Sequence, residues 1–153
     1  MIKNTTIFIL LIALISCTSE KQIMKHPLDN SESRTLVLDN GLKVYLLSDP
    51  NFNVSAASIS VEVGSFQDPE DREGLAHFLE HMLFLGTEKY PDVDEYSSYL
   101  KNNGGFSNAY TARDLTNYHF QVLPDAFDGA LDRSAQFFIG PLFTEEYTAR
   151  EVN

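Results

Sequence analysis

Two histidines and a glutamate, His77, Glu80 and His81, lie within five residues in a segment that is otherwise almost wholly apolar. On a helix that turns about 100° per residue, His81 lies about 40° to one side of His77 and Glu80 about 60° to the other. Histidines four residues apart stand one turn above the other, so their imidazoles can converge on a single ion. Zinc binds imidazole nitrogen readily, and a carboxylate beside it can take a proton from water. The spacing therefore predicts a zinc site with Glu80 as general base.

A simpler explanation of the same pattern is a solvated helix face, because polar residues on one side of a helix usually face water. The apolar residues of this segment occupy the opposite arc of the helix: Leu75, Phe78, Leu79, Met82 and Leu83. The polar arc holds no Lys or Arg, unlike a typical exposed stripe. This composition favours chemistry, and both interpretations stay open on the helix alone.

The elements around this helix are strands first, and then helices and strands mixed. Two β-rich runs flank Asn40-Gly41, a dipeptide that tolerates positive φ, and they predict a hairpin. Alternation from Val54 to Val63 predicts a strand, whose core candidates are Val54, Ala56, Ile59, Val61 and Val63. Periodicity and end signals predict helices at 73–85, 93–103, 124–140 and 144–153, and strands at 106–110 and 117–123. No regular βαβ repeat is present, so we expect an α+β fold, a mostly antiparallel sheet covered by helices.

Three stretches of the sequence resemble one family of enzymes when they are taken in order. They are "GLAHFLEHMLFLGT" at 74–87, "GGFSNAYTARDLTNYHF" at 104–120 and "LDRSAQFF" at 131–138. From about Arg34 to Asn153, the chain resembles the N-terminal domain of the pitrilysin/insulinase family of zinc peptidases, and in particular its large members similar to protease III and insulin-degrading enzyme. The resemblance implies a pitrilysin-like metallohydrolase domain and a zinc metalloendopeptidase that cleaves peptides or small proteins.

The same resemblance implies a role for individual residues. His77 and His81 would bind zinc, and Glu80 would activate water. Glu151 would support the site without binding the metal directly; the alternative for this residue is an exposed helix acid. Asn108 and Ala109 would lie on an edge strand to which an extended substrate adds by backbone hydrogen bonds. The alternative for Asn108 is a turn residue beside Gly104-Gly105.

The expected metal site is incomplete, since three protein ligands are the rule for catalytic zinc. In this family the third ligand is a glutamate about two helical turns beyond Glu151, on the same helix face. The sequence ends at Asn153, so the resemblance implies an N-terminal fragment that lacks this ligand. Two alternatives stay open: a non-catalytic binding or scaffold subunit, and an inactive remnant.

The N-terminal residues of the chain resemble a signal for export and not a part of the folded domain. A nine-residue apolar run from Ile7 to Ile15 has the size of a signal-peptide core. "LISC", ending at Cys17, resembles the bacterial lipobox, which implies removal of residues 1–16 and lipidation of Cys17, the only cysteine. We expect a flexible tether at 17–33, an incomplete peptidase domain at 34–153, and a chain that is lipid-anchored in a bacterial cell envelope and faces the periplasm or the exterior. The net charge of −11 argues against nucleic-acid binding.

Overall fold

The structure is a computed structural model that describes residues 25–151 of the chain. The predicted signal peptide, Cys17 and the first part of the predicted tether lie outside the described residues. The chain divides into two compact units, with the boundary in the sequence between Leu47 and Ser48. No helix among residues 25–151 combines the length and the apolar character that crossing a bilayer requires.

The first unit contains the predicted hairpin. Strands β1 (Glu32–Val37) and β2 (Lys43–Ser48) form a two-stranded sheet, and β1 begins ahead of the predicted start at Arg34. In the connecting turn, Gly41 has a φ of 86° and the Asn40 side chain accepts a hydrogen bond from the Leu42 N–H. The hairpin prediction is confirmed, with the positive φ carried by glycine alone.

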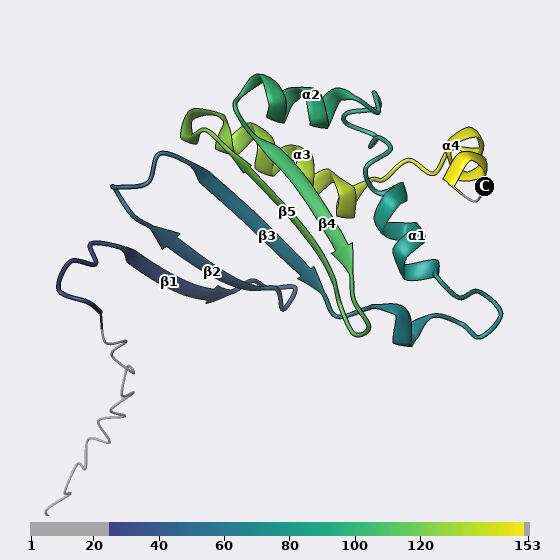
Figure 1. Cartoon of the computed structure of the whole chain (residues 1–153), viewed down its shortest axis with the longest axis horizontal. Coiled ribbons are helices and arrows are strands. Elements are labelled where there is room, and N and C mark those ends of the chain that lie inside the picture. Colours follow the sequence, from purple (N-terminus) through teal and green to yellow (C-terminus); the bar gives the residue numbers. More distant parts are fainter. Residues whose placement is uncertain (1–24, 152–153) are drawn as a thin grey trace, which may run out of the picture. The chain divides into compact units, whose positions relative to one another are not determined.

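The second unit is built on a three-stranded antiparallel sheet (Figure 1). Its strands are β3 (Ser55–Val61), β4 (Phe106–Thr111) and β5 (Thr116–Val122), in the order β3-β5-β4. The central strand β5 pairs Tyr118 with Ile59 of β3 on one side and with Ala109 of β4 on the other. Strand β4 therefore lies at one edge of this sheet.

The core candidates on β3 were only partly right. Ile59 and Val61 are half-buried and pack on the core, as does Ala57. Ala56 is exposed because side chains alternate between the two faces of a strand, and it has the opposite parity to Ile59. Val54 and Val63 lie beyond the two ends of β3 and are exposed as well.

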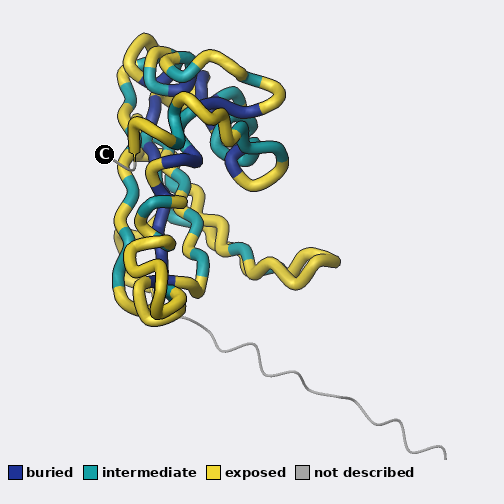
Figure 2. The backbone as a smooth tube through the Cα atoms, turned by 90° about the vertical axis from the view of Figure 1, so that its right-hand side faces the viewer, coloured by how far each residue is buried: buried dark blue, intermediate teal, exposed yellow. Residues whose placement is uncertain are grey.

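Helices supply the second layer of this unit. They are η1 (Ser65–Gln67), α1 (Leu75–Met82), α2 (Glu95–Asn102), η2 (Pro124–Ala126), α3 (Phe127–Ile139) and α4 (Glu145–Glu151). Helices α1 and α2 pack on β4, and α3 packs on β3 and β5. Most residues of β5 are buried, and buried residues are dark blue in Figure 2. The core consists of Leu83, Tyr96, Leu100, Tyr118, Phe120, Val122, Ala126, Ala130 and Phe137. The prediction of an α+β fold is confirmed.

An arginine joins helices α2 and α3. Arg133 on α3 donates from Nε to both carboxylate oxygens of Glu95 on α2, at 2.8 and 3.1 Å. Its guanidinium carbon lies 3.8 Å from the centre of the Tyr99 ring, which also belongs to α2. Because the planar guanidinium makes both contacts at once, Arg133 holds α2 and α3 together through charge and stacking.

Candidate active site

The helix that carries the histidines is capped by a carboxylate from the preceding loop. Gly74, at the N-terminal end of α1, has a φ of 88°, a conformation that favours glycine. Asp68 accepts hydrogen bonds from the N–H groups of Gly74 and Ala76, both at 2.8 Å. The first N–H groups of a helix have no partner within it, and a negative charge there suits the helix dipole. Asp68 therefore stabilises the start of α1.

His77 and His81 point toward each other from successive turns of α1. Their Nε2 atoms lie 3.1 Å apart, and their rings meet edge to face with centroids 4.6 Å apart. Two imidazole nitrogens that each bind one tetrahedral zinc at about 2.1 Å are separated by about 3.4 Å. The observed spacing is close to that value, so the two residues fit a shared zinc ion.

The other ring nitrogen of His81 is paired with Glu151. His81 Nδ1 lies 2.8 Å from Oε2 of Glu151, the last residue of α4. An ionised carboxylate only accepts hydrogen bonds, so Nδ1 carries the hydrogen of this bond. In a neutral imidazole, Nε2 then presents its lone pair toward His77. Metal-binding histidines commonly have such a carboxylate partner, which fixes the ring and its tautomer.

Glu80 faces the sheet rather than the solvent. Only 7% of its surface is exposed, and its Oε2 accepts a hydrogen bond of 2.5 Å from Oγ1 of Thr111, the last residue of β4. Burial, and after it the nearby Glu80 charge, raises the pKa of Tyr118 to about 12. Glu80 is thus buried against β4, whereas His77 and His81 on the same helix are exposed.

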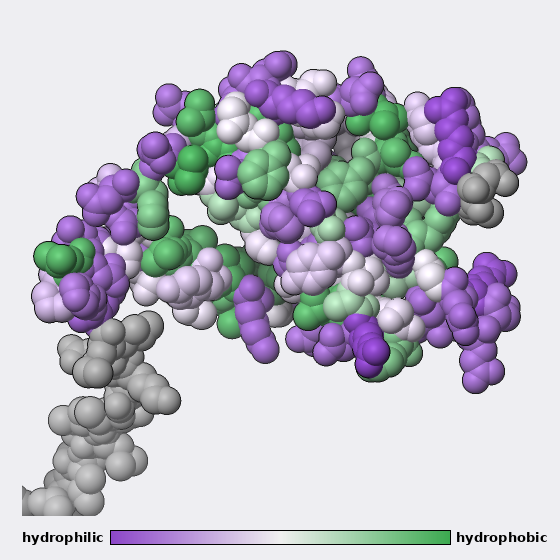
Figure 3. Space-filling model, in the orientation of Figure 1, coloured by the Kyte–Doolittle hydropathy of each residue, from purple (hydrophilic) through white to green (hydrophobic). Residues whose placement is uncertain are grey.

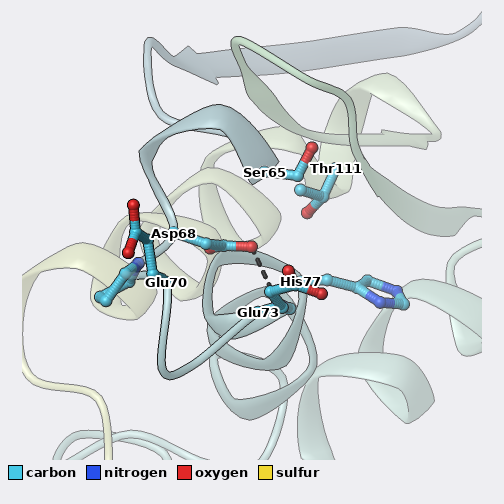
Figure 4. A pocket seen from close by; sticks show the side chains of 8 residues that line it. Ser65, Asp68, Glu70, Glu73, His77 and Thr111 are labelled. Carbon is cyan, nitrogen blue, oxygen red and sulfur yellow. Dashed lines mark hydrogen bonds between the residues drawn. The ribbon is translucent and has the colours of Figure 1, made fainter.

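A groove of about 550 Å³ opens beside His77. Figure 4 shows Ser65 and Thr111 on one side of it, Glu73 and His77 on another, and Asp68 and Glu70 between η1 and α1. The charged loop 68–73 beside it is part of the hydrophilic surface in Figure 3. His77 and Thr111 both line this groove.

The two residues predicted to contact substrate lie within β4. Asn108 pairs with His119 and Ala109 with Tyr118 on β5, so Asn108 is a strand residue and not a turn residue. Because β4 is at the edge of the three-stranded sheet, its second side is not paired within that sheet. The placement is compatible with strand addition, and the substrate role of both residues stays a prediction.

Two contacts of the site were missed from the sequence, those of Thr111 and Asp68. Thr111 lies one residue beyond the predicted strand 106–110, and no pattern in the sequence indicates its contact with a residue 31 positions away. Asp68 caps α1 from six and eight positions upstream, outside the usual capping spacing. Among residues 25–151, no three His, Cys, Asp or Glu side chains are grouped to hold a metal ion.

Comparison with known proteins identifies the family. A family model described as "Insulinase (Peptidase family M16)" matches residues 43–153. Insulin-degrading enzyme of Drosophila melanogaster is 61% identical over 125 residues, which cover 82% of this chain and 13% of that protein. The A-factor-processing enzyme of Saccharomyces cerevisiae is 48% identical over 136 residues, covering 89% of this chain and 13% of that protein.

A solved structure gives the same result for the fold. The crystal structure of pitrilysin matches with a TM-score of 0.81 and 43% sequence identity, over 88% of this chain and 14% of that one. The chain thus spans about one-seventh of the length of the relatives it matches. With its family model matched over most of its length, this chain belongs to the insulinase family of peptidases, a family of zinc metallopeptidases.

Proposed function

We propose that this chain carries part of the active site of a zinc-dependent metalloendopeptidase, with His77 and His81 as metal ligands and Glu80 as general base. The observation that carries the proposal is the 3.1 Å separation of the two Nε2 atoms, with Glu151 on the outer nitrogen of His81. A solvated helix face gives no reason for two imidazoles to converge or for a carboxylate to orient one of them.

The chain's own residues divide the chemistry among them. When bound, a zinc ion lowers the pKa of water at the site and polarises the peptide carbonyl. His77 and His81 would hold the ion, and Glu151 keeps the His81 ring in the tautomer that leaves Nε2 free. Glu80 accepts the proton that water loses and can return it to the leaving amine. The third ligand of such a site has to come from outside the described residues.

Peptides or small proteins are the proposed substrates, and they bind in an extended form. The unpaired side of β4 offers backbone N–H and C=O groups to a peptide strand, with Asn108 and Ala109 in its middle. Relatives are named for action on peptides, among them insulin-degrading enzyme and A-factor-processing enzyme. The groove beside His77 then receives side chains near the cleaved bond.

One observation favours a second candidate, a non-catalytic subunit that binds peptides at β4. Residues 25–151 contain no group of three His, Cys, Asp or Glu side chains placed to hold a metal ion, whereas a catalytic zinc has three protein ligands. This candidate predicts peptide binding without hydrolysis in the longest form of the protein that the gene encodes.

Replacement of Glu80 separates the two candidates. In the longest natural form of the protein, Glu80→Gln should lower kcat for a quenched fluorescent peptide by about 10²- to 10⁴-fold, the range for a general base. Zinc content should stay at the wild-type level. Glu88→Gln, an exposed acid in the loop after α1, is the matched control and should keep full activity. Undiminished hydrolysis by Glu80→Gln would remove Glu80 from its role, and peptide binding without hydrolysis in the wild type would favour the subunit.

The anchoring of the protein is proposed from the sequence alone. Removal of residues 1–16 and lipidation of Cys17 would place the chain on a bacterial cell-envelope membrane, facing the periplasm or the exterior. Labelling of cells with a radioactive fatty acid should mark the wild-type protein and leave Cys17→Ser unlabelled. Equal labelling of both proteins would exclude Cys17 as the lipidated residue.

A further inference from the structure

The hydroxyl of Thr111 is the hydrogen-bond donor that the structure gives to the Glu80 carboxylate. Oγ1 of Thr111, at the end of β4, lies 2.5 Å from Oε2 of Glu80 on α1. We propose that Thr111 is a positioning residue for the base, holding one carboxylate oxygen so that the other faces the water it deprotonates. The proposal rests on the general-base role of Glu80 described above.

The direction of this hydrogen bond follows from counting protons. An ionised carboxylate has no hydrogen to donate, so the single hydroxyl hydrogen of Thr111 goes to Glu80. The Thr116 hydroxyl, 3.3 Å from that of Thr111, donates instead to the Val63 carbonyl at 2.9 Å. Both hydrogens are then used, and Thr111 and Thr116 meet only by packing. Thr111 therefore donates its one hydroxyl hydrogen to Oε2 of Glu80, and Oε1 of Glu80 stays available to water.

Thr111 is suited to this task because its own position is rigid. A branched β-carbon restricts the first side-chain torsion of threonine, and Thr111 pairs with Thr116 across the sheet. Glu80, in contrast, has a long side chain with several rotamers to choose from. A rigid donor on a strand thus selects one orientation of a flexible carboxylate on a helix, which is the usual way in which supporting residues act on catalytic groups.

The location of Thr111 also connects the base with the substrate. The residue lines the same groove as His77 (Figure 4), and it ends the strand that contains Asn108 and Ala109. Its hydroxyl is nevertheless bonded to Glu80 and not directed at a peptide strand on β4. Loss of the hydroxyl should therefore slow the chemical step and leave substrate binding nearly unchanged.

The test compares three threonine variants in the longest natural form of the protein. Thr111→Val keeps the shape and removes the hydroxyl, and we expect kcat to fall about 10- to 100-fold, as for other supporting residues. KM and zinc content should stay at wild-type values, and Thr111→Ser, which restores the hydroxyl, should recover most of kcat. Thr116→Val is the matched control, because its hydroxyl binds a backbone carbonyl, and its kcat should stay near wild type.

Two further measurements distinguish positioning from a general loss of structure. In the Glu80→Gln background, Thr111→Val should cause no additional loss of kcat, because Thr111 acts only through Glu80. A crystal structure of Thr111→Val, which requires no activity, should show the Glu80 carboxylate in a changed or a divided orientation. An unchanged carboxylate together with unchanged kcat would overturn the proposal. If Glu80→Gln is slow while Thr111→Val is not, only the positioning role fails; if Glu80→Gln is fully active, the proposed function fails first.

Discussion

Removal of the Glu151 carboxylate should weaken zinc binding without removing a zinc ligand. The carboxylate lies 2.8 Å from His81 Nδ1 and keeps the Nε2 lone pair pointed at His77. Loss of such a partner typically lowers metal affinity about 10- to 100-fold, which corresponds to about 1.4 to 2.7 kcal/mol. The His81 and Glu151 side chains are 48% and 30% exposed, so solvent screens their attraction. We therefore expect the lower end, about tenfold, for Glu151→Ala.

A competition titration against a chromophoric chelator measures this effect and requires no peptidase activity. Glu151→Gln should fall between Glu151→Ala and the wild type, because an amide oxygen accepts the hydrogen bond without the charge. Glu146→Ala is the matched control on the same helix, since its carboxylate binds Arg150 at 2.6 Å. The reasoning is refuted if Glu151→Ala binds zinc as tightly as the wild type, or if Glu146→Ala loses as much affinity.

Three further predictions concern folding stability and are measured by urea denaturation. Asp68→Ala should lower the free energy of unfolding by about 1 kcal/mol, because two N–H groups at the start of α1 lose their acceptor; equal stability would show that water replaces the cap at no cost. Arg133→Lys should lower the free energy of unfolding by about 1 to 3 kcal/mol, because an ammonium group cannot bind both carboxylate oxygens of Glu95 and stack on the Tyr99 ring at the same time. A loss below the experimental error would show that Arg133 does not hold α2 and α3 together in this way. The raised pKa of Tyr118, about 12 against the ordinary 10.0, means that the folded chain holds the phenolic proton more tightly than the unfolded chain. Its contribution to stability is then complete below pH 10 and is lost as the pH rises to about 12, so Tyr118→Phe should flatten this decline, and identical slopes would contradict it.

The local part of the site could be predicted from the sequence, because helix geometry alone sets it. Residues four apart on a helix share a face, and the structure brings His77 and His81 together as that rule requires. The same rule cannot say which face of the helix is buried by neighbouring elements. Glu80 is buried at 7% exposure, whereas Leu75 and Leu79 on the apolar arc are 42% and 43% exposed. Burial depends on the neighbouring strands, which helical periodicity does not describe.

The tertiary part of the site could be predicted only where a resemblance supplied it. Glu151 was assigned to the site from the family pattern, although it lies 70 positions from His81. Thr111 was missed, since a threonine at the end of a strand is common and its contact with Glu80 depends on how α1 packs on β4. The choice of core residues on β3 was partly wrong for a similar reason. Side chains alternate between the two faces of a strand, and Val54 and Ile59 have opposite parity, so both cannot face the core. Only the packing of the strand decides which of the two faces is buried.

The short helix α1 combines two kinds of geometry that respond differently to movement. The spacing of its two imidazoles is internal to the helix and survives a rigid tilt of α1, whereas the bonds to Thr111 and Glu151 join it to β4 and α4 and break when it tilts. A shift of α1 that broke only the bond to Thr111 would thus release the Glu80 carboxylate and leave the imidazole pair and its Glu151 partner in place. Metal affinity and speed of turnover are for this reason separable properties of the proposed site, and a substitution or a partner that disturbs only the contact of α1 with β4 could change the second and leave the first.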